Sequence, residues 1–502
     1  MGRDSSKKLS TLLMGGLALV ALLTIASGVL VAVVHANDAY HVGHVSGAWL
    51  ALAQYVNEGT LYPPLYDGNA FGGTRYMPLQ ILLYAGTANV VGGDVLAAKL
   101  VVYATAVLLL VVMFLILRGM GCPLVVRVGL LAALLASFTG FWAATAVAGD
   151  ALPLVLQLTA VALAAHGERK SLVAAAGALC ALAVLAKFTA LWAPAAILIW
   201  LLRRDRRLAG IFLGSLVGTF VAGIAAFGFA SDGRLFDNVL GLSGSSFLGF
   251  QSVFLDSPGK FIGLSEGAAR PVAILVPFAL LGLVLGVAER RITIYHLSLV
   301  LAFPLLLVVL ADHGTDSNQL LDVCALTVLV AGGLWAHGEA RSAPGPAPLS
   351  AALVLALLWS VGVGFHQDVR PEAIRAAKIL VGRAGTEAFA LRPPAHHLQP
   401  TDSILSEDPY VPVSLGQRPI VLDAFMLLRI ANTHPEWRSE LIARLDAQEF
   451  DTVVLTRSLD KSRWWQTKSF GPAIVDAIAR NYRPAGRLGW RQLRMYVPRD
   501  RP

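Results

Sequence analysis

Residues 12–34 read LLMGGLALVALLTIASGVLVAVV, an apolar run followed at once by the polar stretch HANDAY at 35–40. A helix of this length can span the roughly 30 Å hydrocarbon core of a bilayer. Comparable runs recur as far as Phe365, and only 14% of the 502 residues are charged, against about 25% in soluble domains. The first run is too long for the apolar part of a secretory signal, and no small-residue cleavage site precedes the polar stretch. The sequence therefore predicts a polytopic α-helical membrane protein.

Clusters of Lys and Arg between the apolar runs predict how the chain crosses the membrane. Positively charged loops stay in the cytoplasm, which places inside Arg3, Lys7, Lys8, Arg118, Arg127, Arg169, Lys170, Arg203, Arg204, Arg206, Arg207, Arg290, Arg291 and Arg341. This alternation requires about eleven transmembrane helices, near 12–34, 95–117, 124–141, 150–165, 171–186, 189–202, 208–230, 270–288, 293–311, 319–336 and 348–365. We expect a multi-pass protein of the plasma (inner) membrane with a cytoplasmic N-terminus and an extracytoplasmic C-terminus. The formal charge of +8 then reflects topology and does not indicate a nucleic-acid partner.

The apolar run at 77–92 does not fit this alternation. It offers only about 15 residues, short of the ~20 needed to span, and it contains Gln80, Thr87 and Asn89. We interpret it as a juxtamembrane or re-entrant helix within a first outer loop at 35–94. A full crossing, the alternative, would move the arginine-rich loops downstream to the outside, against the charge rule.

From His366 onward the composition changes, and charged residues and prolines become frequent. We therefore divide the chain into a transmembrane module at 1–365 and a small extracytoplasmic α/β domain at 366–502. Strand-like runs in this domain are Ser403–Ser406, Ile420–Asp423, Thr452–Thr456 and Arg494–Pro498. Its sequence contains no nucleophile elbow, phosphate loop or metal cluster, so we expect a role in packing, acceptor guiding or partner binding.

Asp38 lies a few residues beyond the first predicted helix, near the membrane interface. A partly desolvated carboxylate at this depth suits a general base that takes a proton from a hydroxyl group. Asp38 could equally cap the amphipathic stretch 39–57, because Asp is a favoured N-cap residue. In that stretch His41 and His44 are three residues apart, but no third ligand is in register, so we expect them to bind substrate or backbone instead of a metal.

The same loop continues with GTLYPPLYDGNAFGGTRYMPLQ at 59–80, which is rich in Gly, Pro and Tyr. Arg75, near its end, is suited to bidentate hydrogen bonds with the phosphate of a lipid carrier. Ordinary phospholipid headgroups are the alternative partner of this arginine. Tyr76 beside it, and Tyr40 close to Asp38, are further substrate-binding candidates.

Three ionisable residues at predicted helix ends on the outer side complete the candidate site. Asp150 opens one helix, where the helix dipole favours an acid, and Lys187 ends another, from which it can reach the lipid headgroups. Asp322 lies slightly inside a third helix and needs a partner, which an outer cation could supply. Because such residues are often functional, Asp150 is a second catalytic candidate, and Lys187 and Asp322 are substrate-binding candidates.

The order of these features resembles the glycosyltransferase C (GT-C) superfamily: an Asp after the first helix, a Tyr/Pro-rich loop leading to a basic residue and a short helix, then an Asp opening a later helix. The pattern is most similar to bacterial members akin to protein O-mannosyltransferases and the aminoarabinose transferase of lipid A. It also includes SN-x-LL-D at Ser317–Asp322 and LSEDP in the tail. The resemblance implies that Asp38 is the catalytic base, Asp150 the second outer carboxylate and Arg75 a contact of the donor phosphate.

Two departures from that pattern bear on the substrates: Ala39 stands where many relatives have Glu, and Gly149 where an Arg often precedes the second Asp. The resemblance implies a membrane hexosyl- or pentosyltransferase that moves a sugar from a polyprenyl-phosphate donor to a hydroxyl of a glycan, lipid or protein, with inversion. Membrane lipids are its other expected partners. Side-chain cations can hold the leaving phosphate, so no cofactor is required, although a divalent metal is compatible with the chemistry. The alternatives are a transporter or flippase of a lipid-linked or anionic substrate, and a polysaccharide polymerase or ligase with the same donor type.

Overall fold

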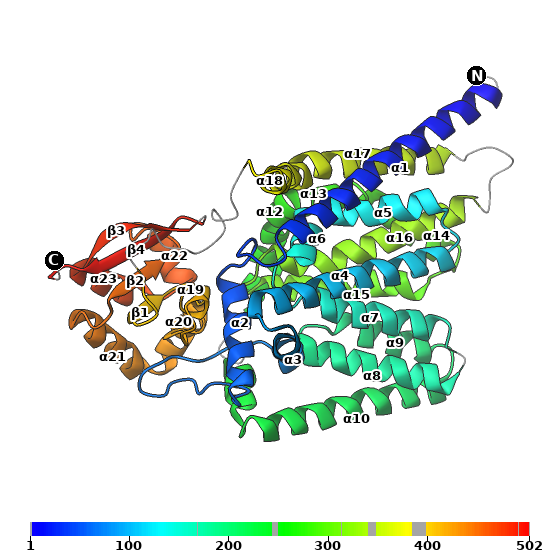
Figure 1. Cartoon of the computed structure of the whole chain (residues 1–502). Helices are drawn as coiled ribbons and strands as arrows, with labels where there is room; N and C mark the ends of the chain where they lie inside the picture. Colours follow the sequence, from blue (N-terminus) through cyan, green and yellow to red (C-terminus); the bar gives the residue numbers. More distant parts are fainter. Residues whose placement is uncertain are drawn as a thin grey trace.

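The computed structural model describes residues 3–167, 169–242, 249–312, 314–339, 348–383, 398–489 and 491–500, so the topology prediction for Arg341 lies outside the described residues. A helical bundle makes up most of the molecule, and a small sheet with its own helices lies at one end of the bundle (Figure 1). We call residues 398–489 and 491–500 the C-terminal α/β unit.

Most predicted spans form helices close to their expected bounds. They are α1 (Arg3–Val34), α4 (Asp94–Gly119), α7 (Ala151–Ala165), α8 (Lys170–Ala186), α9 (Trp192–Leu202), α10 (Arg206–Ala230), α15 (Ile294–Leu310), α16 (Leu321–Glu339) and α17 (Pro348–Gly364). Five helical segments among the described residues are long and apolar enough to cross a membrane, namely Lys8–Val34, Asp94–Gly119, Arg206–Ala230, Ser317–His337 and Leu349–Leu380. The chain is therefore a multi-pass membrane protein, whereas the count of eleven crossings stays a prediction.

The predicted single helix at 124–141 is wrong, because the chain bends by 83° between α5 (Leu124–Ala136) and α6 (Phe138–Thr145). Ser137 adopts an extended conformation between them, and its hydroxyl accepts the N–H of Gly140 as an N-cap. A Cβ at Gly140 would lie 2.0 Å from the carbonyl oxygen of Leu134, so the bend requires glycine there. The bend gives α6 a direction of its own, so that its last residue, Thr145, reaches the loop that follows α1.

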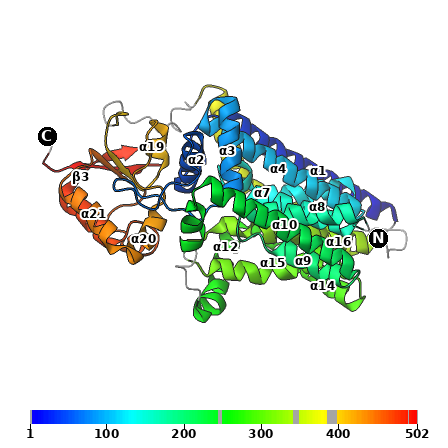
Figure 2. The ribbon, with the colours of Figure 1, turned by 90° about the horizontal axis from the view of Figure 1, so that it is seen from below.

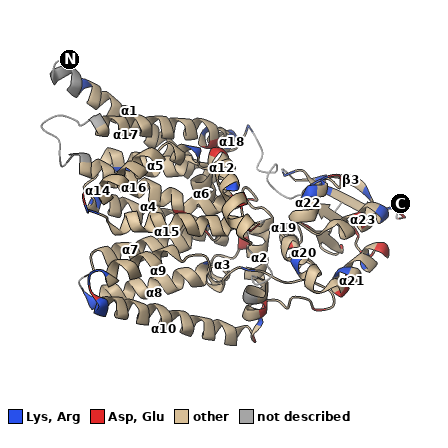
Figure 3. Ribbon diagram, turned by 180° about the vertical axis from the view of Figure 1, so that it is seen from behind, with Lys and Arg blue, Asp and Glu red and all other residues tan. Residues whose placement is uncertain are grey.

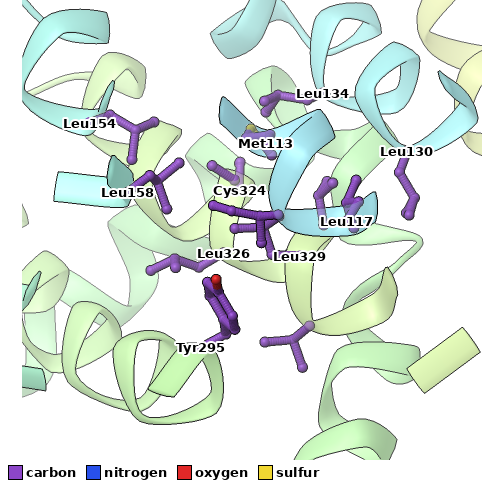
Figure 4. Close-up of a cluster of buried hydrophobic side chains, with 14 of the residues drawn as sticks. Met113, Leu117, Leu130, Leu134, Leu154, Leu158, Tyr295, Cys324, Leu326 and Leu329 are labelled. Carbon is purple, nitrogen blue, oxygen red and sulfur yellow. The ribbon is translucent and has the colours of Figure 1, made fainter. Parts of the chain in front are cut away.

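The bundle core consists mainly of Leu, Ala and Val side chains (Figure 4). Leu117, Leu130 and Leu326 belong to this cluster. Glycines allow close helix contacts, because a Cβ at Gly332 would lie 2.3 Å from Leu117. Small residues serve this purpose in membranes, where helix association depends on packing more than on the hydrophobic effect.

Two short helices of the first outer loop, α2 (His44–Asn57) and α3 (Pro78–Val91), lie between the bundle and the C-terminal α/β unit (Figures 1 and 2). The range of α3 agrees with the short helix predicted at 77–92. The amphipathic helix predicted at 39–57 begins later than expected, at His44.

A second polar segment follows α10 and covers the same end of the bundle. Its helices are η1 (Phe236–Gly241), η2 (Ser252–Asp256), α12 (Ser257–Ala268) and α13 (Arg270–Ala273). The helix predicted at 270–288 is thereby divided, since α14 (Val276–Ala288) starts anew with a proline in its first turn. Proline is well tolerated in the first turn but cannot continue a preceding helix.

The helix α17 does not end where the composition changes at His366. It passes through η4 (Phe365–Val369) into α18 (Arg370–Leu380). The C-terminal α/β unit contains a sheet of order β1-β2-β4-β3, formed by β1 (Ile404–Ser406), β2 (Thr452–Leu455), β3 (Tyr482–Leu488) and β4 (Leu493–Pro498). Its helices are α19 (Tyr410–Ser414), α20 (Ala424–Thr433), α21 (Pro435–Asp446), α22 (Ser462–Thr467) and α23 (Pro472–Asn481).

Three of the predicted strands are present, and β3 was not predicted. The strand predicted at Ile420–Asp423 is wrong, because this segment does not join the sheet. Instead, Val421 forms an isolated parallel bridge with Phe71 of the first outer loop. The segment therefore connects the C-terminal α/β unit to the loop that carries the candidate site.

The basic loops gather where the charge pattern predicts. Figure 3 shows the Lys and Arg residues of the α9–α10 and α14–α15 connections at the end of the bundle away from the C-terminal α/β unit. The side of the membrane that this end faces stays a prediction.

Candidate functional site

The loop that follows α1 holds Asp38 in a fixed position. The Nδ1–H of His35 donates to Oδ2 of Asp38 at 2.7 Å, and the N–H of Tyr40 donates to Oδ1 at 2.9 Å. The Asp38 side chain is 12% exposed. Helix α2 has Gly43 at its N-cap and no side-chain cap, so the capping interpretation of Asp38 is wrong. The carboxylate instead orders its own loop and keeps one face accessible.

The aromatic rings beside Asp38 are stacked on one another. The ring centroids of His35 and Tyr40 are 4.1 Å apart, and those of Tyr40 and His41 are 3.8 Å apart. Burial, followed by the charge of Lys99, lowers the pKa of His41 well below its usual value. His44 is exposed at the start of α2 and so does not share a helical face with His41. No three His, Cys, Asp or Glu side chains in the described ranges are grouped so as to hold a metal ion.

Lys99 of α4 supports this loop from the bundle side, a role that the sequence did not predict. Its side chain is fully buried. Its ammonium donates to the carbonyl oxygen of Tyr40 at 2.5 Å and to that of Thr145 at 3.0 Å. The hydroxyl of Thr145 is in turn 2.8 Å from Nδ1 of His41. One cation thus joins the Asp38 loop to the end of α6.

Asp150, Lys187 and Asp322 come together as a second cluster. Lys187 donates to Oδ1 of Asp150 at 2.8 Å, and the side-chain amide of Asn318 donates to both Asp150 oxygens at 3.1 Å. Trp192 Nε1–H donates to Asp322 at 3.2 Å. A cavity of about 20 Å³ lies beside Asp322 and Trp192, enough for one water molecule. The hydrogen bond to Asp322 thus comes from Trp192, whereas Lys187 pairs with Asp150, so a cationic partner of Asp322 stays a prediction.

Arg75 belongs to a third cluster, which includes a residue of the C-terminal α/β unit. Arg75 Nη1 donates to Oδ2 of Asp312 at 2.5 Å, and Arg429 Nη2 of α20 donates to Oδ1 of the same carboxylate at 3.0 Å. Both guanidinium groups lie over the ring of Phe425, at 5.4 and 4.8 Å from its centroid. The sequence analysis assigned no role to Asp312 or to Arg429.

The three clusters lie at the same end of the bundle and are linked by short stretches of chain. Thr145, in contact with the Asp38 loop, is five residues before Asp150. Trp49 of α2 packs closely on Gly149, because a Cβ at that position would lie only 2.8 Å from the Trp49 ring. Trp49 also stacks on Tyr76, with ring centroids 4.1 Å apart. Tyr76 follows Arg75 directly, so this aromatic pair lies between the second and third clusters.

The C-terminal α/β unit holds the Asp38 loop from the other side. Arg491 donates to the carbonyl oxygen of Val42 at 3.4 Å and pairs with Asp408, whose side chain is fully buried. The contact with α2 is tight, since a Cβ at Gly47 would lie 2.3 Å from the backbone nitrogen of Tyr410. Asp408 belongs to the LSEDP segment that was quoted above as part of the family resemblance.

Replacing Arg491 with alanine is expected to destabilise this junction by about 3–5 kcal/mol, because the buried Asp408 would lose its cation. The unfolding temperature of the purified protein and the rate at which a protease releases the C-terminal α/β unit measure the effect. Arg480→Ala is the matched control, since the Arg480–Asp446 pair is exposed and should contribute less than about 1 kcal/mol. Equal stability of the two variants would show that the junction does not depend on Arg491.

No family profile and no curated protein matches this sequence. Among solved structures, ArnT from Cupriavidus metallidurans in the apo state matches with a TM-score of 0.61 at 14% identity, over 95% of this chain and 97% of that chain. The same protein bound to undecaprenyl phosphate gives a TM-score of 0.60 at 14% identity, with the same coverage. The archaeal oligosaccharyltransferase AglB from Archaeoglobus fulgidus, in complex with an inhibitory peptide and a dolichol-phosphate, gives 0.53 at 10% identity, over 96% of this chain and 75% of that chain. The chain therefore has the fold of these GT-C glycosyltransferases, as the order of its sequence features predicts.

Proposed function

We propose, from the fold shared with ArnT and AglB, that this chain is a membrane glycosyltransferase. It would move a sugar from a polyprenyl-phosphate donor to a hydroxyl of a glycan, lipid or protein on the extracytoplasmic face. The observation that supports the proposal is that an ordered carboxylate, Asp38, and a cationic cluster around Arg75 lie at the same end of a bundle with this fold. The N-terminus would then be cytoplasmic and the C-terminal α/β unit extracytoplasmic.

Asp38 is the proposed base. Its carboxylate accepts the proton of the acceptor hydroxyl while that oxygen bonds to the anomeric carbon. The bond from the anomeric carbon to the phosphate oxygen breaks, and the electron pair leaves with the lipid phosphate. Attack opposite the leaving group inverts the anomeric centre. The hydrogen bonds from His35 and Tyr40 keep the carboxylate oriented for this step.

Arg75 is the proposed cation that stabilises the departing phosphate, assisted by Lys187. A guanidinium group matches phosphate oxygens with two parallel hydrogen bonds. Charge that develops on the leaving oxygen is stabilised most effectively by preorganised donors, which need no rearrangement during the reaction. Lys187 is kept in place by Asp150, so the second carboxylate acts on the donor side through this lysine.

The aromatic side chains near these groups are proposed to bind the substrates. Trp49 and Tyr76 stack on each other, and Tyr40 stacks on both His35 and His41. Trp49 and Tyr40 are buried, whereas Tyr76 and His41 are partly exposed, so Tyr76 and His41 are the rings of these stacks that a substrate can contact. The C–H face of a sugar ring can pack on such a ring.

Sugar transfer from a panel of radiolabelled polyprenyl-phosphate sugars tests the proposal. Membranes that contain the protein should form labelled product with at least one donor, and membranes without it should form none. Labelled lipid that moves across the bilayer without any transfer would instead identify a flippase. Transfer that extends a polysaccharide chain, or that moves a preassembled chain, would identify a polymerase or ligase.

A further inference from the structure

Two arginines that are distant in the sequence meet on one carboxylate at the junction between the outer loop and the C-terminal α/β unit. Arg75 and Arg429 each bind a different oxygen of Asp312. The side chains of Arg75, Arg429 and Asp312 are 26%, 17% and 10% exposed. Water can therefore reach this group of charges.

The surroundings of Asp312 carry a surplus of positive charge. Lys260 of α12 donates to the Asp312 carbonyl oxygen at 2.9 Å and to the hydroxyl of Thr315 at 2.8 Å. Lys468 of the C-terminal α/β unit is close enough for its charge to act on Lys260. Asp316 is the other carboxylate that acts on both lysines. The cluster therefore combines four cationic side chains with two carboxylates.

The pKa values of Asp312 and Lys260 reflect the same excess of positive charge. Burial alone would raise the pKa of Asp312, but the charge of Arg75 and the N–H of Gly314, with Arg429, hold it at about 2. Burial, followed by the charge of Lys468, lowers the pKa of Lys260 to about 8. Asp312 is therefore fully ionised at neutral pH, and another anion would find an excess of cations here.

We propose that Asp312 occupies the place of a phosphate group: the phosphate of the lipid carrier displaces its carboxylate and binds between Arg75 and Arg429. This inference rests on the proposed function and adds to it Arg429 as a donor-binding residue and Asp312 as an exchangeable occupant. The sugar donor is a phosphodiester, with one negative charge and two free oxygens, whereas the carrier released by the transfer is a phosphate monoester with a charge of about −1.5 to −2 and three acceptor oxygens. The released carrier can therefore engage both guanidinium groups more completely than one carboxylate can.

The displaced carboxylate does not become isolated, because Lys260 lies within reach of the Asp312 segment. The competing interpretation is that Asp312 forms permanent salt bridges that hold the outer loop against the C-terminal α/β unit. The two interpretations predict opposite effects of removing the charge of Asp312. If the salt bridges are structural, their loss should weaken binding of the lipid phosphate, whereas if Asp312 competes with the phosphate, its loss should strengthen binding.

Binding of undecaprenyl phosphate to the purified full-length protein distinguishes them. Asp312→Asn should tighten binding several-fold, since the competing anion is gone. Arg429→Ala should weaken it by about 10- to 100-fold, the usual effect of losing a charged hydrogen-bond donor. Arg429→Lys keeps the positive charge but loses the paired N–H donors of the guanidinium group, so its affinity should lie between those of the wild type and Arg429→Ala. Arg480→Ala, an exposed arginine of the same unit, should bind like the wild type. Each variant is compared only after its elution volume and unfolding temperature match the wild type.

Inorganic phosphate and undecaprenol serve as separate probes in the same assay. Competition by inorganic phosphate, together with loss of binding for the alcohol, would assign the site to the phosphate group itself. Unchanged binding in both Asp312→Asn and Arg429→Ala would overturn the inference, and so would weaker binding in Asp312→Asn. Sugar transfer by the wild type is measured separately: transfer with unchanged binding in the variants refutes this inference alone. Altered phosphate binding without transfer from any donor refutes the proposed function alone.

Discussion

Asp38→Asn is expected to lower the rate of sugar transfer by about 10²- to 10⁴-fold, the usual contribution of a general base. An amide has the size of a carboxylate but cannot accept the proton of the acceptor hydroxyl. Its oxygen can still accept the hydrogen bond from the N–H of Tyr40, so the loop should keep its conformation. Initial rates at saturating donor and acceptor, together with the unfolding temperature, measure both properties.

Asp67→Asn is the matched control in the same outer loop. Asp67 is exposed, and its Oδ1 accepts the N–H groups of Asn69 and Ala70 in a turn, which an asparagine oxygen can do equally well. This variant should transfer sugar at the wild-type rate. Full activity of Asp38→Asn would exclude the base assignment. Failure of Asp38→Asn to accumulate in the membrane would show that the carboxylate is needed for folding.

Lys99→Met is expected to have the second largest effect, on stability and activity together. The methionine fills the volume of the side chain but leaves the carbonyl groups of Tyr40 and Thr145 without their donor. Each buried group that loses its partner costs about 1–3 kcal/mol. Unfolding in detergent measures this loss, and Lys170→Met, an exposed lysine in a basic loop, is the control.

The kinetic constants separate a positioning role of Lys99 from a purely structural one. Lys99 holds the carbonyl oxygen of Tyr40, two residues after Asp38, so its loss should misplace the proposed base and lower kcat while leaving KM for the donor nearly unchanged. A destabilised variant with unchanged kcat would indicate that Lys99 only supports the fold. Wild-type stability and wild-type rates would contradict both roles.

Hydropathy predicted the helices well because a membrane span needs a long apolar run, which few other structures contain. The errors fall where a short polar contact overrides hydropathy. The bend at Ser137 depends on one hydroxyl and on the close approach of Gly140 to a carbonyl group, and neither changes the apolar character of the run. The late start of α2 has a similar cause. The Asp38 carboxylate accepts the N–H of Tyr40, and this contact orders the residues that precede α2 in place of a helical turn.

The candidate site was only partly predictable for a different reason. Asp38, Asp150 and Arg75 lie in polar segments at predicted helix ends, where ionisable residues are often functional and can be recognised from the sequence. Lys99 lies inside an apolar run, five residues after the first residue of α4, and only the structure shows that it reaches two carbonyl groups. Arg429 was not predicted because no local pattern links α20 to Asp312, which lies 117 residues earlier in the chain.

The contacts between the first outer loop and the C-terminal α/β unit can form only late in biosynthesis, because their partners are far apart in the sequence. Val42 and its partner Arg491 are 449 residues apart, and Glu58 and Arg418 are 360 residues apart. At about 5–20 residues per second, the ribosome makes Arg491 roughly 20–90 seconds after Val42. During that interval the outer loop has left the ribosome without the side chains that hold it. These contacts therefore form only after Arg491 has been translated, and a chain released before that point would be inserted in the membrane without them.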